Sequence, residues 1–183
     1  MSNRTEALRH LVRESSVDPG RFRAACGMFA TGVGVITAAG PNGRPIGITV
    51  NSFASVSLAP PLVLVCIDSR SSALAWFTRC RVFAINVLSR HQTVHSATFS
   101  GSGRQDSPSE WWSGPYSETP MLEGALATLV CDLRRLFREG DHDILIGHVQ
   151  SIQEMPGEPL IYFHGEYRSL VSTEVQQRQE SRV

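Results

Sequence analysis

A segment dense in hydroxyl groups lies between two strand-like runs in the first half of the chain. Residues 46–50 alternate apolar side chains with small or polar ones, which is typical of a strand with one face in a core. Residues 62–67 are continuously apolar and predict a buried strand, entered in an extended conformation because prolines precede it. Residues 49–57 therefore expose hydroxyls and backbone amides that suit a polar ligand. A single such hydroxyl is more typical of a turn that satisfies its own backbone, and the density of the hydroxyls favours a site.

A candidate anion site follows the buried strand. Ser69, Arg70 and Ser71 precede residues 73–77, which predict the start of a helix. A helix start leaves backbone N–H groups unpaired, and an arginine in its first turn adds a cation, so this segment suits a phosphate. Plain N-capping by Ser69 or Ser71 explains the same residues equally well.

A histidine that could act in catalysis lies between two long alternating segments. Residues 140–142 read Gly-Asp-His and predict a turn. Asp141 and Asp143 flank the imidazole of His142 and either orient the ring or cap the turn, because Gly-Asp is also a common turn composition.

Metal and hydrolytic chemistry have little support in the sequence. His91 and His95 are spaced to share one helical face, but neither a following glutamate nor a nearby third ligand accompanies them, so we expect a solvated helix face and no metal site. There is no Gly-x-Ser-x-Gly motif, and the four cysteines lie far apart without a Cys-x-x-Cys pair, as in reduced core residues.

The elements that must position these residues are mostly strands. An Asp-Pro pair followed by apolar residues at helical spacing predicts a helix over 19–30, and Asn42-Gly43 predicts a hairpin turn. Short helices confined to connections favour a largely antiparallel barrel over a doubly wound sheet, and no Gly-x-Gly-x-x-Gly follows a strand. The predicted strands span 33–39, 44–51, 62–67, 81–88, 126–137, 143–152 and 160–167, with a short helix over 90–99.

Size and charge limit the function classes. The 183 residues fit one domain, which we place at residues 17–171, with polar terminal segments at 1–16 and 172–183. Lys+Arg and Asp+Glu are both 17, so no overall field attracts nucleic acid or an anionic membrane. No apolar run approaches the length that spans a bilayer, and the N-terminus carries no apolar leader, so we expect a cytoplasmic protein.

Five motifs in order make the chain resemble the flavin reductase-like, FMN-binding split-barrel family. The longest reads Gly-x-Thr-x-Asn-Ser-Phe-x-Ser-Val-Ser-x-x-Pro-Pro-Leu-Val, starting at Gly47. The others are residues 31–37, 83–88, 140–142 and 159–168, so the resemblance covers about residues 22–170. The family includes reductase components of two-component flavin-dependent monooxygenases, and it implies a mainly β split barrel with Greek-key, largely antiparallel strands and short helices.

The resemblance also implies roles for the candidate residues. His142 would position the nicotinamide and favour the reduced flavin. The implied flavin-binding residues are Thr49, Asn51 and Ser52 at the ring edge or ribityl chain, Ser55, Val56 and Ser57 nearby, Ser69, Arg70 and Ser71 at the phosphate, and Tyr167 and Arg168 beside the pocket. Tyr167 is also explained as a strand-end aromatic with its hydroxyl in water.

Two functions follow as alternatives. The first is an NAD(P)H-dependent flavin reductase that passes FMN or FAD, reduced by NADH or NADPH, to a partner monooxygenase. Hydride transfer needs no protein nucleophile, which agrees with a chain that is rich in small polar groups. We also expect a homodimer, because residues 62–67 and 160–163 offer more apolar surface than short helices can cover. The second is a flavin- or haem-binding split barrel without turnover.

Overall fold

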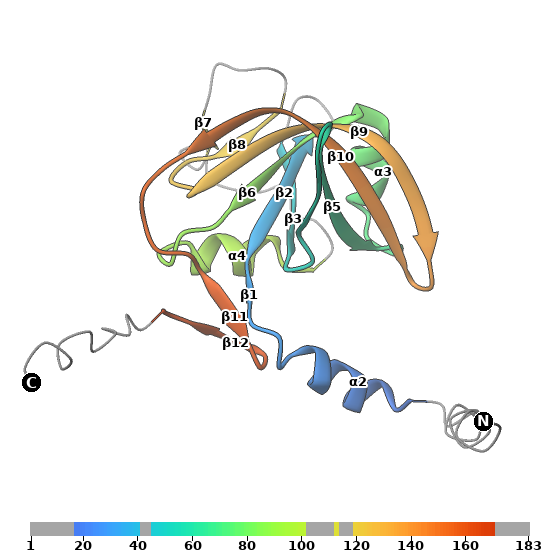
Figure 1. The fold of residues 1–183 in the computed structure, drawn as a ribbon, viewed down its shortest axis with the longest axis vertical. Helices are drawn as coiled ribbons and strands as arrows, with labels where there is room; N and C mark the ends of the chain where they lie inside the picture. Colours follow the sequence, from blue (N-terminus) through green and yellow to red (C-terminus); the bar gives the residue numbers. More distant parts are fainter. Residues whose placement is uncertain (1–16, 41–44, 102–111, 114–118, 171–183) are drawn as a thin grey trace, which may run out of the picture.

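The computed structural model describes residues 17–40, 45–101, 112–113 and 119–170. Within them every pair of named strands is antiparallel, and the helices are short: one precedes the first strand and two lie in connections between strands (Figure 1). The predicted class, mainly β with short helices and antiparallel pairing, is confirmed. No helix among these residues is long and apolar enough to cross a membrane. The expected turn at Asn42-Gly43 lies outside the described residues.

One seven-stranded sheet carries the fold, in the order β3-β2-β6-β9-β10-β5-β4. β9 and β10 form its long hairpin, and β5 pairs with the first half of β10. The bounds are β2 Gly34–Ala39, β3 Pro45–Val50, β4 Ala54–Leu58, β5 Pro61–Asp68, β6 Val82–Val87, β9 Ala127–Glu139 and β10 His142–Glu154.

The two edge strands of this sheet follow each other in the chain. β3 lies at one edge and β4 at the other, and residues 51–53 alone connect them. So short a link spans at most about 13 Å, which forces the edges together and curls the sheet into a barrel. The Ser52 hydroxyl fastens the closure, since it accepts from the Cys66 N–H at 2.9 Å and donates to the Cys66 carbonyl at 3.1 Å.

The strand β4 was not predicted. Residues 54–58 were expected as part of a connecting segment, but they pair with β5 through an irregular register between Ser55 and Ser57. Hydroxyl-rich sequence lowers β-propensity only slightly, and a partner strand three residues away overrides it.

A three-stranded sheet, in the order β1-β11-β12, lies beside the barrel, and a two-stranded one joins β7 to β8. The single strand predicted at 160–167 is wrong: the chain turns at His164 and Gly165, which have φ of 53° and 83°, and forms a hairpin. The bounds are β1 Thr31–Gly32, β7 Trp112–Ser113, β8 Met121–Leu122, β11 Ile161–Phe163 and β12 Glu166–Arg168.

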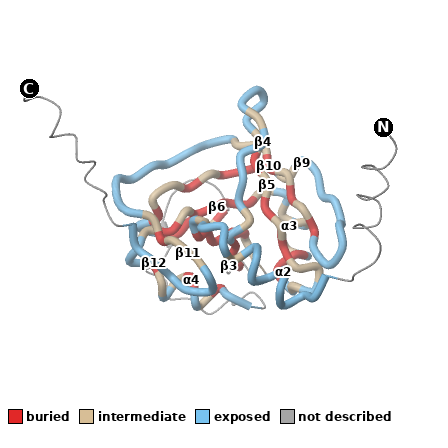
Figure 2. The backbone as a smooth tube through the Cα atoms, turned by 60° about the horizontal axis from the view of Figure 1, so that its bottom comes forward, coloured by how far each residue is buried: buried red, intermediate tan, exposed pale blue. Residues whose placement is uncertain are grey.

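The helices are α2 Pro19–Cys26, α3 Leu74–Cys80 and α4 Thr93–Phe99. As predicted, Asp18 caps α2, because its carboxylate accepts from the Arg21 N–H at 2.8 Å. The helix is shorter than the predicted 19–30, because α2 ends at Cys26. None of its residues is buried, and Phe22 and Phe29 are 63% and 77% exposed. Figure 2 shows α2 as an exposed segment at the periphery.

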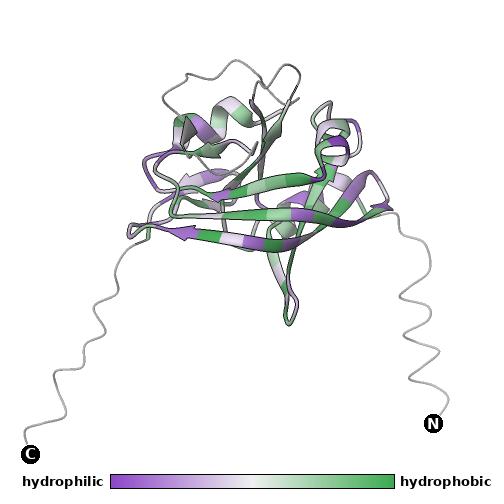
Figure 3. Cartoon of the chain, turned by 90° about the horizontal axis from the view of Figure 1, so that it is seen from above, coloured by the Kyte–Doolittle hydropathy of each residue, from purple (hydrophilic) through white to green (hydrophobic). Residues whose placement is uncertain are grey.

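Alternate side chains of the sheet strands form the core. Along β5, Val63, Val65 and Ile67 point inward, while the residues between them are half-buried. Figure 3 shows the hydrophobic stretches concentrated along the strands. The opposite face of β3 is covered by α4: a Cβ added at Gly47 would lie 2.6 Å from the Phe99 ring, so this position accepts glycine alone without displacing α4.

A buried asparagine on β6 links this strand to its sheet neighbours β2 and β9 and to the separate strand β8. The Asn86 amide donates to the Val35 carbonyl at 2.9 Å and to the Thr37 hydroxyl at 3.0 Å. Its oxygen accepts from the Leu122 N–H at 2.9 Å and from the Thr128 hydroxyl at 3.2 Å. Both donors and both lone pairs of the amide are therefore used, which makes its burial favourable.

We expect Asn86→Ala to lower the free energy of unfolding by about 2–4 kcal/mol, because it leaves several buried polar groups without partners. Urea denaturation measures the loss. The control is Gln150→Ala, which removes an exposed amide from β10 and should cost less than about 0.5 kcal/mol. Equal losses in the two variants would contradict the importance of the Asn86 network.

Candidate functional site

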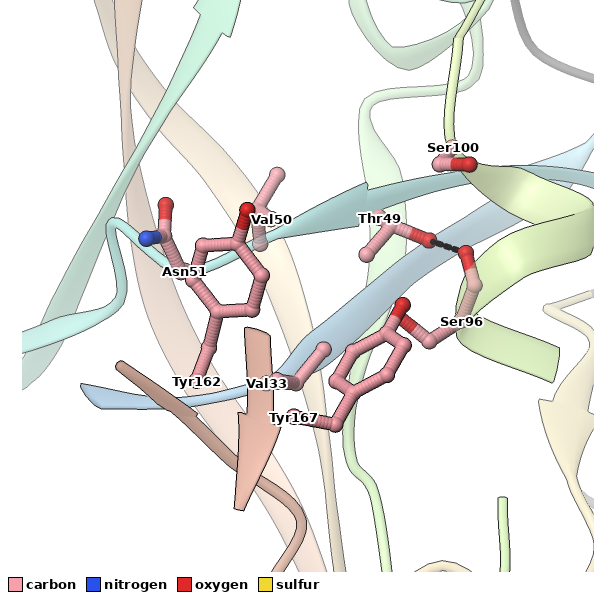
Figure 4. Close-up of a pocket in the computed structure, with 8 residues that line it drawn as sticks. All are labelled: Val33, Thr49, Val50, Asn51, Ser96, Ser100, Tyr162 and Tyr167. Atoms are coloured by element: carbon pink, nitrogen blue, oxygen red, sulfur yellow. Dashed lines mark hydrogen bonds between the residues drawn. The ribbon is translucent and has the colours of Figure 1, made fainter. Parts of the chain in front are cut away.

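A pocket of about 220 Å³ lies where β3 ends and faces α4 and the β11–β12 hairpin (Figure 4). It contains three of the predicted flavin-binding residues, Thr49, Asn51 and Tyr167. The full lining is Val33, Thr49, Val50, Asn51, Ser96, Ser100, Tyr162 and Tyr167.

Ser96 holds three walls of this pocket together. The Thr49 hydroxyl donates to the Ser96 carbonyl at 2.7 Å, and the Tyr167 hydroxyl donates to the Ser96 Oγ at 2.8 Å. Ser96 is fully buried, so both bonds are shielded from competing water. The explanation of Tyr167 as a strand-end aromatic with a solvated hydroxyl is therefore wrong.

The sequence analysis missed Ser96, Ser100 and Tyr162. The two serines are four residues apart at α4, a spacing that places side chains on one helical face, so a search for polar pairs at helical spacing finds them. Tyr162 packs against Tyr167 with the ring centroids 5.8 Å apart in an edge-to-face arrangement. That contact depends on the β11–β12 hairpin, which was predicted as one strand.

A second pocket, of about 260 Å³, adjoins the first through Val33 and Asn51. It is mostly apolar, with Phe29, Phe53 and Ile85 in its walls. Asn51 therefore lies between a pocket of aromatic rings and hydroxyls and an apolar one. All of the residues that line either pocket are uncharged, which suits a flat, neutral ring system with polar edges.

The predicted phosphate segment and His142 are neighbours at the other end of β5. His142 is the first residue of β10 rather than part of the turn, and it lies opposite Asp68 of β5. The Ser69 N–H donates to the Asp141 carbonyl at 3.0 Å. Asp141 Oδ1 lies 2.6 Å from His142 Nδ1, so Nε2 is the ring atom that can face a ligand. Hydrogen bonding to this imidazole lowers the pKa of Asp141.

Arg70 is exposed, but its guanidinium is already engaged. Its Nη2 and Nε contact the two carboxylate oxygens of Asp68 at 2.8 Å and 3.1 Å, and its backbone N–H donates to Asp68 at 2.8 Å. These hydrogen bonds hold the pKa of Asp68 well below its usual range and raise that of Arg70. A phosphate at Arg70 would share the cation with Asp68.

Asp143 is the buried carboxylate of this region. Its side chain is 6% exposed, and its Oδ2 accepts from Arg138 Nη2 at 2.9 Å and from the Ser69 hydroxyl at 2.5 Å. These two contacts lower the pKa of Asp143. Ser71 does not cap α3 at the N-cap position, which is Ala73, although its hydroxyl accepts weakly from the Ala73 N–H at 3.3 Å.

The remaining candidates lie apart from the pockets. Ser52 is committed to Cys66, as described above, and Arg168 forms an ion pair with Glu166 at 2.5 Å. Ser55, Val56 and Ser57 lie on the edge strand β4. The structure thus places these candidates in two groups, one around Asn51 and one around His142.

A metal site is not formed by the described residues, among which no group of three or more His, Cys, Asp or Glu side chains could hold an ion. The expectation that His91 and His95 share a helical face is wrong, because α4 begins at Thr93.

Comparison with known proteins gives the class. The flavin reductase like domain family matches residues 26–171, and the chain belongs to this family. Its fold is the split β-barrel of solved flavin reductases: the NADH:FAD oxidoreductase SgcE6 of Streptomyces globisporus, in complex with NAD and FAD fragments, superposes with a TM-score of 0.79 at 34% identity, over 88% of this chain and 99% of that one.

Two curated relatives are more specific in name. The reductase subunit HsaB of a flavin-dependent monooxygenase from Rhodococcus jostii is 38% identical over 87% of this chain and 82% of its own length. The FMN reductase (NADH) SmoA of Agrobacterium fabrum is 43% identical over 80% of this chain and 83% of its own.

We expect Asp143 to stabilise the fold in a pH-dependent way. Because its pKa is lowered in the native state, its contribution is complete above the unfolded pKa, about 4, and is lost as pH falls through the native value. Asp143→Asn should therefore be less stable than wild type at pH 7, and the difference should shrink below about pH 4. Urea denaturation between pH 7 and pH 3 tests this, and a difference that does not change with pH would contradict it.

Proposed function

We propose that this protein is an NAD(P)H-dependent flavin reductase that reduces FMN or FAD and supplies diffusible reduced flavin to a partner flavin-dependent monooxygenase. The observation that carries the proposal is the neutral pocket of tyrosine rings and hydroxyls that meets an apolar pocket at Asn51. This lining fits an isoalloxazine, whose ring is flat and whose edge carries hydrogen-bonding groups. The names of HsaB and SmoA support the reductase role, and we take NADH as the preferred donor, as in SmoA.

A bound flavin supplies the redox chemistry, so the chain has to bind and align the reactants. Thr49 and Asn51 lie where they can contact the ring, with Tyr167 as a wall of the same pocket. Ser52 follows Asn51 and offers its backbone to the flavin, because its hydroxyl is bonded to Cys66. Ser55, Val56 and Ser57 come next and offer hydroxyls and amides, with Arg168 near the hairpin end. Ser69, Arg70 and Ser71 form the phosphate segment.

His142 is the proposed catalytic group. Its Nδ1 is held by Asp141, and its side chain is 47% exposed, so Nε2 is oriented and accessible. From this position it positions the nicotinamide and stabilises the negative charge of the reduced flavin. His142 lies beside the phosphate segment of its own chain and does not line the Asn51 pocket, so in this proposal it acts on a ring held in the Asn51 pocket of another chain.

A homodimer brings the two groups into one site in this proposal. The outer face of the sheet carries a row of apolar side chains, in which the half-buried Cys66 and Ile144 and the exposed Phe137 lie side by side in register. Phe137 is 45% exposed, and α2 projects with no buried residue of its own. Uncovered apolar surface of this extent favours burial against a second copy, with two equivalent flavin sites per dimer.

The proposal also covers the bounds of the domain and its location in the cell. Residues 17–171 form one flavin reductase-like domain, and a cytoplasmic location gives it access to NADH and to a monooxygenase.

Turnover with and without flavin tests the proposed function. We expect the purified protein to oxidise NADH at 340 nm only when FMN or FAD is added, because the product must leave for the partner. His142→Ala should raise the Michaelis constant for NADH and slow reduction, while the flavin affinity stays largely unchanged. Flavin binding without any NADH oxidation would favour a flavin-binding module, and absence of binding would refute both.

Sedimentation tests the dimer. We expect a species of twice the 20.1 kDa chain mass, and Phe137→Asp should shift it toward monomer and weaken flavin binding at the same concentration. Val94→Asp removes a similarly exposed apolar side chain from α4 and should leave the dimer intact. A wild-type monomer with full flavin affinity would show that one chain builds the site.

A further inference from the structure

Asp143 links the proposed phosphate segment, through Ser69, to the start of β10, where His142 lies. It lies on β10 directly after His142, yet its side chain points to the protected side, where Oδ2 accepts from Ser69 of the segment 68–71. The same segment is tied to the turn before β10 by the bond from the Ser69 N–H to the Asp141 carbonyl. Residues 68–71 are thus held at two points, one through backbone and one through the Asp143 carboxylate.

The charge of Asp143 needs compensation at this place. A carboxylate near a phosphate group repels it, and the nearby groups include two further carboxylates, Asp68 and Asp141. Arg138 reaches from β9 and contacts Asp143 at 2.9 Å, so this carboxylate is neutralised where it is buried. The pair therefore orders the segment without adding net negative charge.

We propose that Asp143, neutralised by Arg138, is a positioning residue that fixes the segment 68–71 against the β9–β10 turn and thereby sets the affinity for the flavin phosphate. The proposal rests on the proposed function, which assigns the phosphate to Ser69, Arg70 and Ser71. Its physical basis is preorganisation: a segment that is already ordered loses less conformational freedom when the phosphate binds. The isoalloxazine pocket at Asn51 shares no residue with this device.

The test compares two ligands that differ in the phosphate alone, FMN and riboflavin, by titration of flavin fluorescence. In Asp143→Asn, which keeps the side-chain size, we expect the Kd for FMN to rise about tenfold, the ratio for one charge-assisted hydrogen bond, and the Kd for riboflavin to stay within about twofold. Arg138→Gln should show the same selective loss of FMN affinity, because it leaves the Asp143 carboxylate without a compensating cation. This variant provides the test if Asp143→Asn does not fold.

The control is Asp132→Asn, which neutralises an exposed carboxylate on β9 that bonds Gln150. It should change neither Kd. An unchanged Kd for FMN in folded Asp143→Asn and Arg138→Gln, or equal weakening of both ligands, would overturn the positioning role. Measurements on the wild type distinguish failure of the positioning role from failure of the proposed function. Equal wild-type affinity for FMN and riboflavin would overturn the phosphate assignment, and no binding of either ligand would overturn the flavin site. Either of these two results would overturn the positioning role as well.

Discussion

The closure of the barrel by residues 51–53 is the constraint on which the rest of the structure depends. The edge strands β3 and β4 are neighbours in sequence but occupy opposite ends of the sheet order, so a three-residue link must bring the edges together. The Ser52 hydroxyl stabilises that closure through its two hydrogen bonds with the Cys66 backbone. The neighbouring Asn51 is thereby placed between two pockets, and the Asn51 pocket exists because the sheet is closed there.

The strand before this link has to serve both the core and the site. Ile46, Ile48 and Val50 fill the barrel interior, and the alternate residues face α4. Gly47 lets the Phe99 ring approach the backbone, which brings α4 close enough for the Thr49 hydroxyl to reach the Ser96 carbonyl. The missing side chain at position 47 thus determines the position of a wall of the pocket two residues away.

Most of the sheet could be predicted from the sequence, because period-2 alternation and turn residues are local signals. The strands β2, β3, β5, β6, β9 and β10 were anticipated within a few residues. The strand β4, the β11–β12 hairpin and the exposed face of α2 were not, since each depends on distant partners or on what covers it. For the same reason, the sequence indicated Thr49, Asn51 and Tyr167 but not Ser96, which reaches them from a helix over forty residues away.

Electrostatic pairing around the proposed phosphate segment bears on how firmly a flavin is held. Arg70 is paired with Asp68, Arg138 with Asp143, and His142 lies against Asp141. Each group that can attract a phosphate is accompanied by a carboxylate, so the attraction between this segment and a dianion is weaker than that of an unpaired arginine cluster. Arg70 is also 86% exposed, where solvent and salt screen its charge further. Within residues 69–71, the three backbone N–H groups and the Ser69 hydroxyl proton already have protein acceptors, which leaves the Ser71 hydroxyl and the remaining N–H groups of Arg70 for a phosphate. So few donors hold a phosphate weakly, which agrees with a flavin that must leave after reduction.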